Sequence, residues 1–250
     1  MKRDHFSGEV AERYDDDGLM FSSEVLCPTV DFLVSHAGDG TALEFGIGTG
    51  RVALPLAQRG VRVQGIDLSE AMVAKLREKP GAERIGTTIG DFATTRVDGT
   101  FSLVYLVFNT IGNLTTQDEQ VACFQNAADH LEPGGRFVIE VGVPDLQRLA
   151  PGDRFYPFEV SPEHIGLDEY DVANQGLVSH HLEPDGGVWR MSSIPFRYVW
   201  PAELDLMARL AGMWLRERWQ DWDRSPFTSE SRKHVSVWEQ PGVEQGRDRG

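Results

Sequence analysis

Three glycines at alternate positions, directly after a short apolar run that contains an acid, are the part of this sequence best suited to chemistry. The acid is Glu44, and the glycines are Gly46, Gly48 and Gly50. Because glycine lacks a Cβ atom, the backbone there can turn sharply and a ligand can lie directly against it. A helical pattern follows at once. The first N–H groups of that helix would therefore face the same ligand.

An acid follows the next strand pattern at a distance that suits nucleoside binding. Residues 61–66 alternate between apolar and polar types and end on Asp67, which lies 17 residues after Gly50. In doubly wound folds, an acid placed in this way after a glycine-rich turn binds ribose hydroxyls. The alternative is that Asp67 only caps the helix that begins near Ser69. The agreement between its spacing and the glycine loop favours ribose binding.

Two cofactor classes use such a turn, and Arg51 separates them. A dinucleotide fingerprint requires a glycine or another small residue three positions after its second glycine. Counted from Gly48, that position holds Arg51, which is large and charged, so a nicotinamide-dependent oxidoreductase is disfavoured. The acid-x-Gly-x-Gly-x-Gly pattern of residues 44–50 resembles motif I of the class I methyltransferases that depend on S-adenosylmethionine (SAM). The run His130–Gly135, ahead of an apolar strand, is similar to a second signature of that family.

The resemblance covers residues 41–141 by motif and implies SAM as the cofactor, with S-adenosylhomocysteine as the product. Family members hold the methionyl part of SAM in the glycine loop and near the end of the fourth strand. Gly90-Asp91-Phe92 is similar to their adenine site, where a carboxylate accepts from the amino group and an aromatic ring covers the base. The cofactor residues that the resemblance implies are Glu44, Gly46, Gly48, Gly50, Asp67, Leu68, Met72, Asp91, Phe92, Val107 and Phe108.

Three residues are predicted to lie on the acceptor side of the site. Tyr14 precedes three acids, at a place where small-molecule members of the family often carry a Tyr-Asp pair that folds over cofactor and acceptor. Asn109 and Asn113 follow an apolar strand pattern, and the carboxyl ends of central strands carry reacting groups in such sheets. We therefore expect Tyr14, Asn109 and Asn113 to be the catalytic residues. The alternatives are a packed tyrosine and asparagines that only satisfy loop backbone.

Three histidines are further alternatives for a general base. His180 and His181 are neighbours in one strand pattern, so only one of them can face a given surface. His164 is no better placed. A base is needed only if the acceptor must lose a proton, and an amine with a free lone pair requires none. The sequence has no Asn-Pro-Pro-Tyr run and no Pro-Cys pair, which disfavours nucleobases as acceptors.

Strand and helix patterns alternate up to residue 143, which predicts a parallel sheet with right-handed crossovers. Together with the resemblance, this indicates a Rossmann-like, doubly wound, seven-stranded α/β fold. Pro55 predicts a late start or a kink in the helix behind the glycine loop. Strand patterns at 177–182 and 188–200, around a turn at 183–187, predict a small antiparallel β insertion.

The chain divides into five expected parts. Apolar residues between Phe21 and Val34 recur at helical spacing, and the final residues are polar and glycine-rich. The parts are an N-terminal helical cover (1–40), the SAM-binding core (41–143), an antiparallel β cap (144–200), the completion of the core sheet (201–239) and a disordered tail (240–250).

Composition excludes several classes of function. The formal net charge of −15 disfavours DNA and RNA as partners, because an acidic surface repels phosphate. Cys27 and Cys123 lack a zinc-ligand spacing, so no metal is expected, and both are interpreted as small buried hydrophobes. We expect no signal peptide, because the first residues lead into acids, and no membrane span, because the apolar runs are too short. We therefore expect a soluble, cytoplasmic protein without membrane contact.

The predicted function is transfer of a methyl group from SAM to an oxygen or nitrogen atom of a small-molecule acceptor. Methylation of protein or RNA is an alternative, and so is a non-catalytic partner protein with a SAM fold. The sequence leaves the oligomeric state open, with a homodimer as one alternative.

Overall fold

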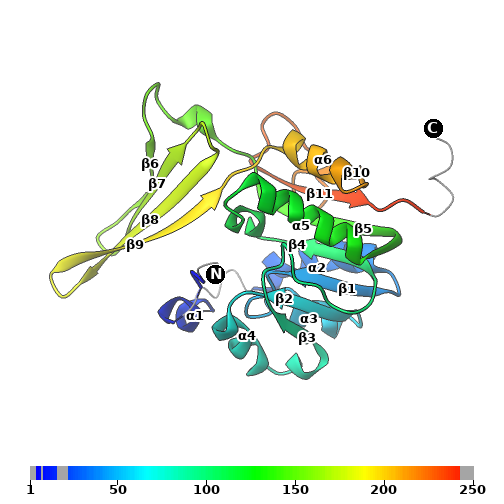
Figure 1. Cartoon of the computed structure of the whole chain (residues 1–250). Coiled ribbons are helices and arrows are strands. Elements are labelled where there is room, and N and C mark those ends of the chain that lie inside the picture. Colours follow the sequence, from blue (N-terminus) through cyan, green and yellow to red (C-terminus); the bar gives the residue numbers. More distant parts are fainter. Residues whose placement is uncertain (1–3, 7, 16–21, 243–250) are drawn as a thin grey trace.

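The computed structural model describes residues 4–6, 8–15 and 22–242, which form a seven-stranded sheet and a separate four-stranded sheet (Figure 1). The larger sheet has the order β10-β11-β5-β4-β1-β2-β3, in which β1 to β5 run parallel and β11 runs antiparallel to its neighbours. The predicted doubly wound sheet is confirmed. Its strands are β1 (Thr41–Phe45), β2 (Arg62–Asp67), β3 (Gly86–Ile89), β4 (Phe101–Leu106), β5 (Leu131–Gly142), β10 (Trp214–Trp219) and β11 (Lys233–Glu239).

Helices cover both faces of this sheet and bury two separate hydrophobic cores. Central strand β4 contributes to both cores, because its residues alternate between the faces: Leu103 lies in one core and Val104 in the other. One face is covered by α2 (Ser23–Ala37), α3 (Ala53–Gln58) and α4 (Glu70–Arg77), and the other by α5 (Gln117–His130) and α6 (Pro201–Leu210).

Local sequence signals explain several helix starts. Ser69 caps α4, since its Oγ accepts from the backbone N of Met72 at 3.3 Å. Helix α6 begins with Pro201 at its first position, as predicted. The predicted late start behind the glycine loop is confirmed, because α3 begins at Ala53. Pro55 is then the third residue of the helix, where the missing N–H costs no intrahelical bond.

The four-stranded insert sheet projects from the body (Figure 1). Its order is β6-β7-β8-β9, with antiparallel pairing throughout. Its strands are β6 (Phe155–Val160), β7 (Ile165–Asp171), β8 (Gly176–Asp185) and β9 (Val188–Arg197).

Two predicted boundaries in the insert sheet are wrong. The hairpin turn is only Gly186–Gly187, with φ of 59° and 90°, rather than 183–187. A two-residue turn of this kind requires positive φ, which glycine adopts without strain. Strand β9 ends at Arg197 instead of Trp200, which is the N-cap of α6. Strands β6 and β7 were not predicted, because β6 is mostly exposed and shows no alternation of burial.

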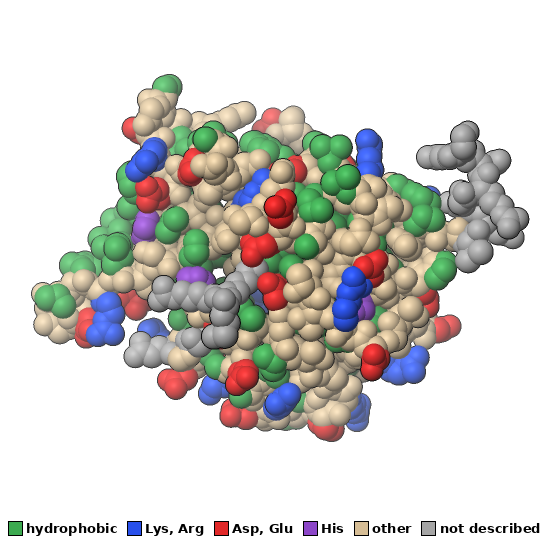
Figure 2. Space-filling view, viewed as in Figure 1, with side chains coloured by type: hydrophobic (Ala, Val, Ile, Leu, Met, Phe, Trp, Pro, Cys, Tyr) green, Lys and Arg blue, Asp and Glu red, His purple; other side chains and the backbone are tan. Residues whose placement is uncertain are grey.

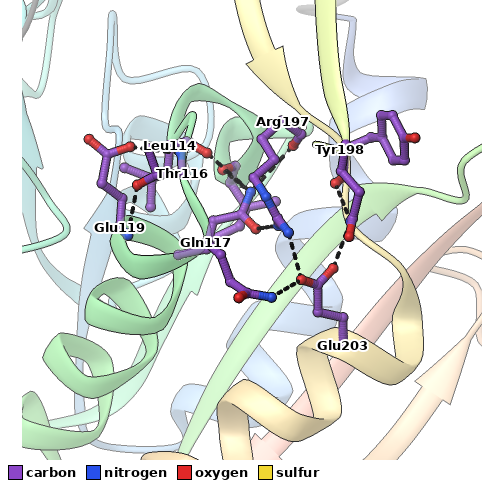
Figure 3. Close-up of polar contacts among 10 residues, drawn as sticks. Leu114, Thr116, Gln117, Glu119, Arg197, Tyr198 and Glu203 are labelled. Atoms are coloured by element: carbon purple, nitrogen blue, oxygen red, sulfur yellow. Dashed lines mark hydrogen bonds and ion pairs between the residues drawn. The ribbon is translucent and has the colours of Figure 1, made fainter. Parts of the chain in front are cut away.

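A buried ion pair joins the insert sheet to the body (Figure 3). Arg197, the last residue of β9, donates to Oε1 of Glu203 on α6 at 2.7 Å. It also donates to Oε1 of Gln120 on α5 at 2.5 Å. Gln120 in turn donates to the backbone O of Ile111 at 3.3 Å and of Leu114 at 3.2 Å. The group therefore fixes the short 3₁₀-helix η3 (Thr110–Asn113) as well as the end of β9.

The chain termini and the cysteines differ in part from expectation. Gln240, predicted as the first residue of a disordered tail, is ordered, because its N–H donates to the O of Gly135 at 2.9 Å. The predicted turn before β5 is the irregular first part of that strand, with φ of 83° at Gly134. Residues 243–250, like Phe21 of the N-terminal cover, lie outside the described residues. Cys123 is buried as predicted, whereas Cys27 is exposed because it lies on the outer face of α2.

None of the helices within the described ranges has the length and hydrophobicity that a membrane crossing requires. The same residues hold no group of three or more His, Cys, Asp or Glu side chains arranged for a metal ion. Acidic and basic side chains are interspersed over the visible face of the body, and hydrophobic side chains gather on the projecting insert sheet (Figure 2). The exposed ones include Phe155, Phe158, Val160, Val188, Trp189 and Met191.

Candidate active site

A cavity of about 310 Å³ lies where β1, β2 and β3 end, and the sequence motifs meet there. Its volume falls in the range of small-molecule sites, roughly 300–1,000 Å³. The predicted residues that line it are Tyr14, Gly46, Gly48, Asp67, Leu68, Met72, Asp91, Phe92 and Asn113. The predicted residues outside its lining are Glu44, Gly50, Val107, Phe108 and Asn109.

The glycine loop has no room for side chains at two of its positions. Gly46 has φ of 72°, and a Cβ atom added there would lie 2.7 Å from Cγ2 of Thr110. Gly50 has φ of 78°, and a Cβ atom there would overlap Cδ1 of Leu76. Both the backbone conformation and the available space therefore require glycine.

Asp67 is connected to the glycine loop on one side and to the third strand on the other. Its Oδ2 accepts from the N of Gly48 at 2.7 Å, and its Oδ1 accepts from the N of Ser69 at 2.8 Å. Its backbone O accepts from the N of Gly90 at 2.8 Å, directly before Asp91. Burial raises the pKa of Asp67, and the bonds from Ser69 and Gly48 oppose that rise. The three predicted motifs are thus joined by hydrogen bonds of the protein itself.

The ring of Phe92 lines the cavity and is held in place by its neighbours. It stacks on Phe45 with 5.9 Å between ring centroids and an interplanar angle of 24°. Its backbone O accepts from Nδ2 of Asn126 at 2.7 Å. Oδ1 of the neighbouring Asp91 accepts from the N of Ala93 at 3.0 Å, which closes a tight turn after β3.

Glu44 lies buried below the glycine loop. It is 3% exposed, and its Oε2 accepts from the hydroxyl of Tyr105 at 2.9 Å. Burial raises the pKa of Glu44 to about 8, against the opposing effects of Tyr105 and Arg51. The acid of the motif is therefore protonated in much of the population at neutral pH.

The N-terminal segment forms a wall over the cavity, with Tyr14 in its lining. The next residue, Asp15, accepts through Oδ1 from Oγ1 of Thr49 at 2.7 Å and pairs through Oδ2 with Nζ of Lys79 at 2.5 Å. Lys79 also donates to the backbone O of Thr49 at 2.8 Å. A second attachment runs from Oγ of Ser69 to the backbone O of Phe6 at 3.1 Å. Helix α1 (Glu9–Arg13) lies beside α4 (Figure 1).

The two predicted asparagines lie on different cavities. Asn113 lines the first cavity, whereas Asn109 lines a second one of about 560 Å³ between the insert sheet and the ends of β4 and β5. Oδ1 of Asn109 accepts from the N of Gly142 at 2.5 Å. Asn109 thus bonds to loop backbone, which is the alternative to a catalytic role that the sequence left open. Catalytic roles for Tyr14, Asn109 and Asn113 stay predictions.

Strand β9 separates the two cavities. Pro195 lines the first and Phe196 lines the second, because consecutive residues of a strand point to opposite faces. The two histidines of β8, as consecutive residues, likewise lie on opposite faces of the insert sheet. His180 pairs with Oγ of Ser193 at 2.8 Å, and His181 pairs with His164 at 3.0 Å.

Seven residues that line the first cavity were not predicted from the sequence. Thr110, Leu114 and Thr115 flank predicted positions, so a wider window after the fourth strand would have included them. The N-terminal residues carry no pattern that distinguishes them, and Pro195 is a proline within an edge strand. The complete set is Asp4, His5, Phe6, Thr110, Leu114, Thr115 and Pro195.

Comparison with known proteins agrees with this site. Residues 42–135 match the family described as Methyltransferase domain. The solved CcbJ methyltransferase from Streptomyces caelestis is 40% identical, with 86% of this chain and 89% of that chain covered and a TM-score of 0.78. The chain therefore belongs to the class I SAM-dependent methyltransferases, and SAM is its cofactor.

Two further similarities extend over most of the chain. The cypemycin N-terminal methyltransferase of a Streptomyces species is 29% identical over 204 residues, which are 80% of this chain and 82% of that protein. The SAM-bound structure of an amino pentose methyltransferase from Micromonospora echinaspora covers 95% of this chain and 99% of that one. Its TM-score is 0.67 at 22% identity, so it shows the shared fold alone.

Proposed function

We propose that this methyltransferase methylates an amine nitrogen of a small natural-product acceptor, with a hydroxyl oxygen as the alternative atom. The proposal is supported by the name of a similar protein, the cypemycin N-terminal methyltransferase, which states a peptide N-terminus as the acceptor.

One observation carries the proposal: the glycine loop, Asp67 and the Asp91–Phe92 pair line a single cavity. The residues present fit SAM. Asp67 would hold the ribose hydroxyls, since backbone donors already fix its carboxylate. Asp91 and Phe92 would hold adenine, and the side-chain-free crease at Gly46 and Gly48 would take the amino-acid tail.

The chemistry requires alignment more than acid–base catalysis. SAM, when bound, supplies a methyl group that the positive charge on sulfur already activates. The cavity walls orient the acceptor and exclude water, and such alignment can be worth roughly 7–11 kcal/mol. Burial raises the pKa of Tyr14, against the charge of Arg51, so its hydroxyl stays protonated, and its oxygen can accept an N–H of the acceptor amine while the nitrogen lone pair stays free. Tyr14 and Asn113 would orient an amine through hydrogen bonds, without removing a proton.

Calorimetry with S-adenosylhomocysteine tests the cofactor part of this assignment. We expect the native chain to bind and Asp67→Ala to bind at least about tenfold more weakly, because the ribose hydroxyls lose a charged acceptor. Asp98→Ala, at an exposed loop position, is the matched control and should bind as the native chain does. Equal affinity in Asp67→Ala would show that the ribose contact is misplaced. Binding of NAD in place of S-adenosylhomocysteine would favour an oxidoreductase.

An acceptor screen tests the second part. Matched small amines and alcohols, including amino sugars with their hydroxyl counterparts and short peptides, are incubated with SAM and followed by mass spectrometry. We expect a mass gain of one methylene group on amines, and Asp67→Ala should reduce this gain when SAM is limiting. Methylation of the alcohols alone would contradict the choice of nitrogen. Cofactor binding with no turnover on any acceptor would favour a non-catalytic partner protein.

A further inference from the structure

The turn directly after β4 has a strained backbone. Two consecutive residues other than glycine, Phe108 and Asn109, have φ of 56° and 58°. Side chains of L-residues disfavour this left-handed region, so such a pair persists only where its surroundings fix it. Strain of this kind gathers at functional sites. The neighbours that hold this turn therefore indicate what it positions.

Glu140 on β5 holds both residues of the turn. Its Oε2 accepts from the N of Phe108 at 3.1 Å, and its backbone O accepts from the N of Asn109 at 3.3 Å. Glu140 is 8% exposed, so water competes little for these bonds. Its other oxygen, Oε1, lies 3.4 Å from Nζ of Lys233, which pairs with Asp221 at 2.8 Å. Lys233 thus balances the charge of the Glu140 carboxylate at Oε1, while Oε2 of the same carboxylate holds the turn through Phe108.

The turn is also fastened to the glycine loop at two points. The guanidinium carbon of Arg51, which directly follows the loop, lies 3.2 Å from the centroid of the Phe108 ring. Thr110 fills the space that Gly46 leaves, since its Cγ2 would be 2.7 Å from a Cβ atom on that glycine. A displacement of the turn would therefore move the wall that faces Gly46.

We propose that Glu140 is a positioning residue, which holds the Phe108–Asn109 turn against the glycine loop and so shapes the end of the cavity that receives the amino-acid tail of SAM. This rests on the proposed function, which places that tail at the glycine loop. The nucleoside end is fixed independently of Glu140. Asp67 is held by the N–H groups of Gly48 and Ser69, and Asp91 by its own turn.

The test compares two ligands that differ in the tail. S-adenosylhomocysteine carries the amino-acid tail, and 5′-methylthioadenosine has the same nucleoside and sulfur without it. Calorimetry on Glu140→Ala should show about tenfold weaker binding of S-adenosylhomocysteine, because the turn loses its charged acceptor. Binding of 5′-methylthioadenosine should stay within about twofold of native, since its contacts lie elsewhere.

Two further variants complete the design. Glu140→Gln keeps an oxygen for the N–H of Phe108 and should restore most of the lost affinity. Glu239→Ala removes a carboxylate from the neighbouring strand β11, where it pairs with Arg136 and Arg216, and should change neither affinity. If thermal unfolding shows that Glu140→Ala does not fold, Asn109→Ala replaces it. That variant breaks the bond to Gly142 and should give the same selective loss.

Unchanged binding of S-adenosylhomocysteine by Glu140→Ala would overturn the inference. Equal weakening of both ligands would do so too, because it would show a general loss of structure and not a role at the tail. A native chain that binds neither ligand would contradict the proposed function itself, and the inference would fall with it.

Discussion

Burial sets Glu44 apart from the other acids of the cofactor motifs. Asp67 and Asp91 line the cavity, whereas Glu44 lies in the interior with its Oε2 bonded to Tyr105. Because an ionised carboxylate is costly to desolvate, the folded protein favours the protonated form. Glu44 thus connects β1 to β4 beneath the glycine loop, and the stability of the loop becomes sensitive to pH.

The raised pKa of Glu44 predicts a specific pH dependence of stability. The folded pKa of about 8 exceeds the ordinary glutamate pKa of 4.5, so between these limits the folded state holds the extra proton. The contribution of this proton to the free energy of unfolding is complete below about pH 4.5. It is lost as the pH rises towards and through 8. Glu44→Gln should remove this loss, and its stability relative to the native chain should increase by on the order of 3 kcal/mol from pH 5 to pH 8. Urea unfolding at several pH values measures the difference, and parallel curves for the two proteins would contradict it.

The sequence predicted those site residues that lie at the carboxyl end of a strand. Asp67 ends β2 at a distance from the glycine loop that predicts ribose binding, and Asp91 follows β3 in a motif similar to the family's adenine site; both line the cavity. Glu140 gave no such signal. It lies inside β5, and its bond to Phe108 spans 32 positions along the chain. No local pattern of residue types encodes a contact between two strands at that separation.

At the scale of elements, the N-terminal segment is held to the glycine loop by the Asp15–Lys79–Thr49 contacts. Lys79→Met should release Asp15 and with it Tyr14, the neighbouring wall of the cavity. We expect faster hydrogen exchange in residues 8–15 and about three- to tenfold weaker binding of S-adenosylhomocysteine, because a wall of the site becomes mobile. Hydrogen exchange by mass spectrometry and calorimetry measure the two effects.

Lys75→Met is the matched control for this prediction. Lys75 lies on α4, four residues before Lys79, and forms a long ion pair of 4.0 Å with Glu78. It should leave both exchange and affinity at native values. Slow exchange of residues 8–15 in Lys79→Met would show that the segment is held by its other contacts, such as Phe6 with Ser69.

The joint between the insert sheet and the body predicts a large stability effect (Figure 3). The side chain of Arg197 is 5% exposed and that of Glu203 is 15% exposed. Burial alone would raise the pKa of Glu203, yet hydrogen bonds from Arg197, Gln175 and Gln117 lower it. Arg197→Met should destabilise the protein by about 3–5 kcal/mol, because Glu203 is left without its buried partner. Arg190→Met, at an exposed ion pair of the same strand, should cost at most about 1 kcal/mol. Urea unfolding measures the free energy of unfolding of both variants. An equal loss in Arg197→Met and Arg190→Met would contradict a buried joint.

At the scale of the whole molecule, the formal charge of −15 acts against compactness. Screening by salt should therefore stabilise the fold at neutral pH. We expect the melting temperature to rise by a few degrees between about 0.01 and 0.3 M sodium chloride, as the screening length shortens. Near the isoelectric point of about 4.8 the same salt should have little effect. Calorimetric scans measure this, and an equal rise at both pH values would indicate a cause other than charge.

The body of the fold was predictable because each parallel strand is followed by a signal of its own, such as the glycine loop after β1 or Asp67 at the end of β2. The insert sheet offered fewer signals. Both faces of β6 are largely exposed, so its residues were under no pressure to alternate. The division of Asn109 and Asn113 between two cavities depends on where the end of β9 contacts η3, a tertiary contact that local patterns do not describe.

Because β9 lies between the two cavities, it limits the insertions and deletions that this strand can accept. Adding or deleting one residue within the strand ahead of Pro195 would rotate every later side chain by half a turn, which would send the proline ring outward and bring Phe196 to the cofactor side. Viable length variants of this ribbon should therefore differ by even numbers of residues, or else carry a compensating bulge. When related enzymes with other acceptors are aligned along this strand, the informative quantity is whether their lengths differ by an odd or an even number of residues, rather than their composition.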